Sequence, residues 1–86
     1  MNAETRQLIR LSILQMLDAA PHNGLAVSML STGLQARGLR DVGNEEIRKE
    51  LAYLADKQLV VQGKQAISPE LAPWRINADG RDTLAS

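Results

Sequence analysis

The side chains best suited to chemistry in this chain lie between Asn44 and Lys57, and their amide, guanidinium, ammonium and carboxylate groups are suited to hydrogen bonding. Arginine can donate two hydrogen bonds to guanine, and asparagine can exchange a pair with adenine. Arg48 and Asn44 therefore predict contacts with base edges if this stretch enters a major groove. Glu45 has acceptors for cytosine, although its charge repels phosphate. The predicted base-facing set is Asn44, Glu45, Arg48, Lys49 and Ala52, with Tyr53 at its rim.

Only a helix brings these side chains to one surface, and the spacing of the apolar residues predicts one from about Asn44 to Lys57. At ~100° per residue, four apolar residues fall in one narrow stripe on the opposite side. They are Ile47, Leu51, Leu54 and Ala55. The polar pair Gly43-Asn44 predicts the N-cap, and the acids that follow suit the helix dipole. We therefore expect an amphipathic helix with a polar outer flank.

The charge balance leaves a second interpretation of this flank open. The chain has 10 Lys and Arg against 10 Asp and Glu, so no overall basic field draws it to a polyanion. Pairs such as Glu45–Lys49 and Glu46–Lys49 are typical of an ordinary solvated helix face. Any affinity for nucleic acid must then come from local arrangement or from two copies acting together. Candidate contacts to the DNA backbone are Arg37, Arg40 and Lys57, with Lys64 and Gln65 at the tip of a loop after the helix.

The first predicted helix, from about Glu4 to Ala19, has two apolar sides instead of one. One group holds the core positions Ile9, Ile13, Met16, Leu17 and Ala20, and the other holds Leu8, Leu11 and Leu14. A helix with one apolar stripe needs one neighbouring surface to bury it, and a helix with two apolar stripes needs two such surfaces. We therefore expect a homodimer through Leu8, Leu11 and Leu14. The alternative is that the last helix folds back over Leu8 and Leu11 within one chain.

The rest of the chain predicts a second helix and a β-ribbon. After the breaker cluster Pro21–Gly24 comes a very short strand at 25–27, and Ser28 is the expected cap of a helix through about Arg37. Gly33 permits close approach of a neighbouring helix, and Gly38 closes this one in a left-handed conformation. Strands are expected at 59–61 and 74–76 on either side of a polar loop, with Trp74 as a core plug and Asn77 capping a last short helix. The fold class is mainly α with a small β-wing.

These segments resemble the winged helix-turn-helix regulators of bacteria and phages. The stretches that carry the resemblance are Gly38-Leu39, residues 42–51, residues 53–60 and residues 74–82. In those regulators a helix of the form R-x-x-L-x-x-L precedes a Gly-Leu-Val strand, and the ribbon ends in W-x-[IL]-[TN]-x-x-G. Gln58 stands where they usually have glycine, and Asn77 where they usually have threonine. The chain also looks like short winged-helix proteins of Mu-like prophages.

The predicted element order is α-β-α-α-β-β-α, and a chain of 86 residues is long enough for a single domain over residues 1–86. The resemblance implies a regulator of transcription that binds double-stranded DNA, which the two-sided first helix would make a homodimer. Winged helices also serve as protein-docking modules, so an assembly factor of the same fold that touches no DNA is the competing hypothesis. Metal-sensing repressors of this fold use Cys or clustered His. Here there is no Cys, and His22 is the single His, in a turn beside Pro21.

Other classes of protein fit the sequence poorly. Without cysteine there are no disulfides, thiolate metal sites or cysteine nucleophiles, which fits an intracellular protein. We find no Ser/His/Asp set, paired-carboxylate motif, P-loop or dinucleotide fingerprint, so we expect no enzyme, no cofactor and no metal. The longest apolar-rich run, residues 8–20, is interrupted by polar residues and predicts neither a membrane span nor a signal peptide. We therefore expect a cytoplasmic protein.

Overall fold

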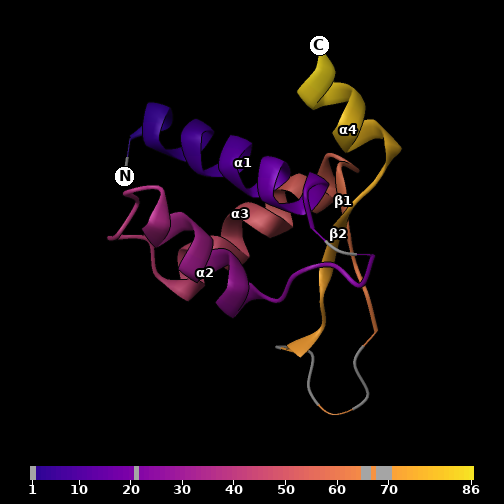
Figure 1. Ribbon diagram of the computed structural model, residues 1–86. Helices are drawn as coiled ribbons and strands as arrows, with labels where there is room; N and C mark the ends of the chain where they lie inside the picture. Colours follow the sequence, from indigo (N-terminus) through magenta and orange to yellow (C-terminus); the bar gives the residue numbers. More distant parts are fainter. Residues whose placement is uncertain (1, 21, 65–66, 68–70) are drawn as a thin grey trace.

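A computed structural model of the chain describes residues 2–20, 22–64, 67 and 71–86. Within those residues the chain forms four helices and one ribbon of two antiparallel strands (Figure 1). The elements are α1 (Ala3–Asp18), α2 (Val27–Ala36), α3 (Asn44–Asp56), β1 (Val60–Gln62), β2 (Trp74–Ile76) and α4 (Ala78–Ala85). The predicted mainly helical chain with a small antiparallel ribbon is confirmed, and each predicted helix is present to within two residues at its ends.

The core lies where α1, α2 and α3 meet the inner face of the ribbon. Its fully buried side chains come from all three helices and from β1, and they are Ile9, Ile13, Leu30, Leu34, Ile47, Leu51, Leu54 and Val60. Trp74 is half-buried and packs against this cluster from the side of β2, as predicted for a core plug. Gly33 faces Met16, and a Cβ on Gly33 would overlap the Met16 sulfur, so this glycine does allow α1 and α2 to approach closely.

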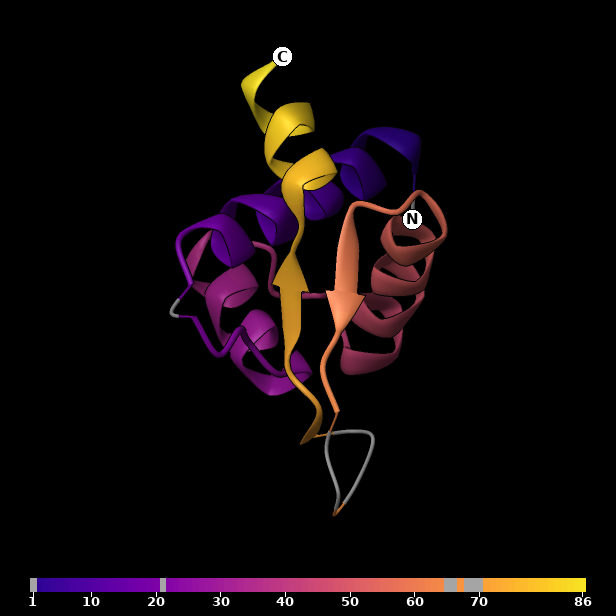
Figure 2. The ribbon, with the colours of Figure 1, turned by 90° about the vertical axis from the view of Figure 1, so that its right-hand side faces the viewer.

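The ribbon lies alongside α3 with a fixed register. Val60 pairs with Ile76, Val61 with Arg75 and Gln62 with Trp74. The strand predicted at 25–27 is reduced to one isolated bridge, in which Leu25 and Trp74 exchange backbone hydrogen bonds of 2.9 and 2.7 Å. Figures 1 and 2 show α3 and β1 running in opposite directions. The N-terminal end of α3 and the far end of the ribbon therefore lie at the same end of the molecule.

Two predicted positions are corrected by the structure. Ser28 is the second residue of α2 and not its cap. The extended residue before the helix is Ala26, which makes no side-chain capping bond. Leu14, expected on the outer side of α1, is 4% exposed and belongs to the core. The reason is angular: Leu14 lies one turn before Leu17, about 60° away around the helix, so the buried arc of α1 is wide enough to include it.

Helices α2 and α3 end in the same hydrogen-bonded turn. In α2, the N–H of Leu39 donates to Leu34 O, and Gly38 has the left-handed φ of 89° that was predicted. In α3, the N–H of Leu59 donates to Leu54 O at 3.0 Å, and Gln58 takes the left-handed place with φ 62°. This is a Schellman turn, whose left-handed position favours glycine. Gln58 is the position at which the resembling regulators carry glycine, and its backbone conformation gives the reason.

Asn77 joins this turn to the last helix. Its side-chain amide donates to Gln58 O at 2.6 Å, and its Oδ1 accepts from the N–H of Gly80 at 2.9 Å, so the predicted cap of α4 is confirmed. A Cβ on Gly80 would overlap the backbone oxygen of Leu59. The start of α4 is therefore fixed directly against the connection between α3 and β1.

The left-handed Gln58 generates a stability prediction. We expect Gln58→Gly to be more stable to urea than Gln58→Ala by about 1 kcal/mol, because a Cβ is strained at positive φ and both variants lack the glutamine side chain. Lys57 is the control, since its φ of −81° is open to any residue. There the order should reverse, with Lys57→Ala the more stable. Equal stability of the two Gln58 variants would contradict the assigned conformation.

Candidate nucleic-acid interface

The outer flank of α3 is uncovered in the structure. Ile47, Leu51 and Leu54 on the inner side are at most 2% exposed. The predicted base-facing residues Asn44, Glu45, Arg48, Lys49 and Ala52 are all exposed. No other described part of the chain seals this surface, so the condition that a DNA-binding flank must be accessible is met.

The flank carries charges of both signs, and some of its cations form ion pairs whereas others do not. The Lys49 ammonium lies 3.7 Å from a Glu46 carboxylate oxygen, one of the two pairs expected from the sequence. Both side chains are well solvated, and such pairs contribute little to stability, so Lys49 remains able to exchange partners. The Arg48 side chain makes no hydrogen bond or ion pair with any described residue. Its guanidinium is therefore the cation on this flank that needs no rearrangement to meet an anion.

Tyr53, the predicted rim residue, is 40% exposed, but the face of its ring is occupied. The Arg10 guanidinium carbon lies 3.7 Å from the ring centroid, and the Lys57 ammonium lies 5.6 Å from it. These are cation–π distances. Tyr53 therefore joins α3 to α1 in addition to bordering the flank, and Lys57 is drawn toward the same ring.

Behind Tyr53 lies a pair that sequence reasoning missed. The Nε of Arg10 donates to Glu50 Oε1 at 2.6 Å, and the Glu50 side chain is 6% exposed against 25% for Arg10. A signal for this was present, because position 50 falls three residues after Ile47 and four before Leu54, on the inner side of the helix. A carboxylate at such a position needs a cation, and Arg10 supplies it from α1.

The predicted backbone contacts other than Lys57 lie on three different segments. Arg37, at the end of α2, is held by Gln15 of α1 through a 2.7 Å hydrogen bond from its Nη1. Arg40 is exposed in the connection that leads into the N-terminal end of α3. Lys64 is exposed just beyond β1, whereas Gln65 falls outside the described residues. The structure thus brings Arg40 and the start of α3 together in the chain, and it turns Arg37 toward α1.

Residues 2–20, 22–64, 67 and 71–86 hold no group of three or more His, Cys, Asp or Glu that could bind a metal ion. None of the helices in those ranges has the length and apolar character needed to cross a lipid bilayer.

No protein-family model, curated protein or solved structure matches the chain. The winged-helix assignment therefore depends on the resemblance of the sequence motifs and on the arrangement of α2, α3 and the ribbon. It stays a prediction.

The Arg10–Glu50 pair generates the second stability prediction. We expect Arg10→Met to lower the free energy of unfolding by about 2–3 kcal/mol, because it leaves a buried carboxylate without its charged partner. Adding Glu50→Gln should recover most of that loss, since the amide removes the charge at nearly the same volume. Urea denaturation of both variants measures the difference. If the double variant is no more stable than Arg10→Met alone, the buried charge is not the cause.

Proposed function

We propose that the chain is a DNA-binding protein of the winged helix-turn-helix class, with α3 as the helix that enters the major groove. One observation carries the proposal: α3 buries Ile47, Leu51 and Leu54 and leaves its polar flank open. The N-terminal end of α3 lies at the end of the molecule to which the ribbon also extends (Figure 2). A helix of 13 residues with one free side fits the width of a major groove.

The roles of the side chains follow from their chemistry and place. Arg48 is the candidate for guanine, and Asn44, in the first turn of α3, is the candidate for adenine. Arg40 precedes the helix and is suited to a phosphate, as is Lys64 on the ribbon. Lys57 and Arg37 are weaker candidates because each already contacts another side chain, Tyr53 and Gln15 respectively.

The neutral net charge makes a dimer part of the proposal. A single copy offers few unpaired cations, and two copies bound to one site double the number of phosphate contacts. Leu8 and Leu11 on α1 are 49% and 45% exposed, and α4 leaves both uncovered. Two apolar side chains one turn apart on a helix are suited to a second copy of the same helix. The protein would then be a cytoplasmic regulator of transcription, of bacterial or phage type, that reads a pseudo-palindromic site.

The competing function, a protein-docking module, has its own support. Glu45 is exposed on the same flank as Arg48, and Asp56 is exposed one turn after Ala52. Acids at these places repel phosphate and suit a partner protein of mixed charge. The two functions differ in how binding responds to salt, because DNA releases counterions when its phosphates are contacted.

The DNA prediction compares Arg48→Ala with Arg6→Ala, which removes an equally exposed cation from α1. We expect the wild type to bind pooled duplex DNA with an affinity that falls as salt rises, by a log–log slope of about −0.9 for each phosphate contacted. Arg48→Ala should weaken binding about tenfold or more, since a good contact to a base is worth about 1–3 kcal/mol. Arg6→Ala should bind like the wild type. Fluorescence anisotropy at 50–200 mM salt measures all three.

Two results would count against this function. Absence of binding at low salt would end the DNA proposal and favour the docking module. Equal losses in the Arg48 and Arg6 variants would show that the protein responds to total charge and not to the flank of α3. Circular dichroism of each variant checks that the fold is intact.

The dimer prediction uses Leu11→Asp, with Met29→Asp as its control. Met29 is 57% exposed on α2 and is as apolar as Leu11. We expect the wild type and Met29→Asp to sediment as dimers and Leu11→Asp as a monomer, because a charge buried in the junction of two α1 helices lacks a partner. A monomeric wild type, or dimers in all three proteins, would contradict the assignment of α1 as the interface.

A further inference from the structure

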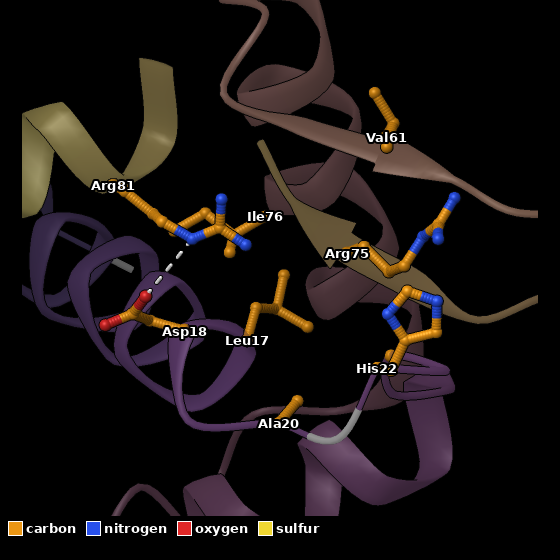
Figure 3. Close-up of a pocket in the computed structure, with 9 residues that line it drawn as sticks. Leu17, Asp18, Ala20, His22, Val61, Arg75, Ile76 and Arg81 are labelled. Carbon is orange, nitrogen blue, oxygen red and sulfur yellow. Dashed lines mark ion pairs between the residues drawn. The ribbon is translucent and has the colours of Figure 1, made fainter. Parts of the chain in front are cut away.

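The structure has a recess away from the α3 flank. It lies between the C-terminal end of α1, the α1–α2 connection, the ribbon and α4. Its volume is about 310 Å³. The residues that line it are Leu17, Asp18, Ala20, His22, Gly24, Val61, Arg75, Ile76 and Arg81 (Figure 3). None of the residues assigned to the flank of α3 takes part, so this recess is independent of the proposed DNA contacts.

The recess has an apolar centre and cationic ends. Leu17 and Ile76, 3% and 6% exposed, belong to the core and present only small apolar surfaces here. Figure 3 shows Leu17 in the middle, Arg81 to one side of it, and Arg75 with His22 to the other. Val61 closes the recess from β1. A ligand bound in this recess would contact apolar side chains in the centre and a basic side chain at each end.

The two arginines are in different states. Arg81 is paired through its Nε with Asp18 at 3.6 Å, in a solvated geometry that holds the ion pair only weakly. The Arg75 guanidinium makes no hydrogen bond or ion pair with any described residue. Two contacts fix the direction of the Arg75 side chain. Its backbone pairs with Val61 across the ribbon, and its Cγ packs close to Gly24 in the α1–α2 connection. A guanidinium with a fixed stem and five free donors is suited to a carboxylate or a phosphate.

We propose that this recess binds a small organic anion, a carboxylate or phosphate group on an apolar body of about one ring. Arg75 and His22 would meet the anionic group, and the apolar body would lie over Leu17 beside Val61. The volume supports the size, because 310 Å³ is near the lower limit of small-molecule sites. Among the lining residues Asp18 carries the one negative charge, and it opposes the anion by its own field and by holding Arg81.

The test is an NMR titration of the full-length ¹⁵N-labelled chain with phenyl phosphate and, separately, with benzoate. For so small a ligand we expect a Kd on the order of 1 mM, with shifts concentrated at the amides of His22, Gly24, Val61 and Arg75. Phenol and inorganic phosphate are the matched controls, because each carries half of the required chemistry. Both should bind at least fivefold more weakly. The stronger of the two anionic ligands identifies whether phosphate or carboxylate is preferred.

Three variants should change the affinity for the anion in three different ways. Arg75→Gln keeps the stem that packs on Gly24 and should weaken binding at least fivefold, whereas Arg6→Gln, on the exposed side of α1, should leave it unchanged. Asp18→Asn should tighten binding about twofold or more, because it removes the opposing charge and releases Arg81. A general loss of structure cannot produce that increase.

The proposal is overturned by any of three results. The first is no saturable shift with either anion up to 20-fold above the expected Kd, on the order of 20 mM. The second is equal affinity of Arg75→Gln and Arg6→Gln. The third is phenol binding as tightly as phenyl phosphate, which would show an apolar recess without anion recognition.

Discussion

Glu50 is a charged residue on the inner side of α3, and the neutralisation of its charge determines how α1 crosses the helix that carries the candidate interface. Its carboxylate is almost fully buried and receives a 2.6 Å hydrogen bond from Arg10. The same guanidinium covers the ring of Tyr53, one turn further along α3. A buried carboxylate without a partner is costly, so only a position of α1 that delivers Arg10 is compatible with this core. Removing one partner of such a pair is costly, because the other charge then stays buried alone.

A second constraint fixes the far end of α3. The helix ends in a turn whose left-handed residue is Gln58, and the oxygen of that residue accepts a hydrogen bond from Asn77. Gly80 then packs against Leu59 so closely that no side chain fits between them. The C-terminal end of α3, the start of β1 and the start of α4 therefore form one rigid junction. With Arg10 holding the middle of α3, the orientation of its outer flank is determined at two points.

Much of this arrangement could be predicted from the sequence, because local signals agree with one another. The stripe Ile47–Leu51–Leu54, the breaker at Gly38 and the β-branched run after Gln58 each specify an element without knowledge of its neighbours. What could not be predicted depends on long-range contacts. The pairing of Arg10 with Glu50 spans 40 residues. The two apolar groups on α1 predict two faces with Leu14 on the outer one, whereas the core covers an arc wide enough to include Leu14. Residue type alone favours Ser28 as the cap, but the extended residue before α2 is Ala26, which follows the long-range bridge between Leu25 and Trp74.

The net charge of zero is a poor guide to partners here, because many of the cations are already engaged within the fold. Ion pairs join Arg10 to Glu50, Lys49 to Glu46 and Arg81 to Asp18. Arg37 donates a hydrogen bond to Gln15. Four guanidinium groups make no ion pair or hydrogen bond with described side chains, those of Arg6, Arg40, Arg48 and Arg75. Arg48 lies on the flank of α3, and Arg75 lines the recess. An anion approaching the protein meets these local charges and not the sum over the chain, since screening limits the reach of a charge to about 10 Å at 0.1 M salt. Under the two proposals, Arg48 would meet a polyanion at the flank of α3 and Arg75 a small anion at the recess.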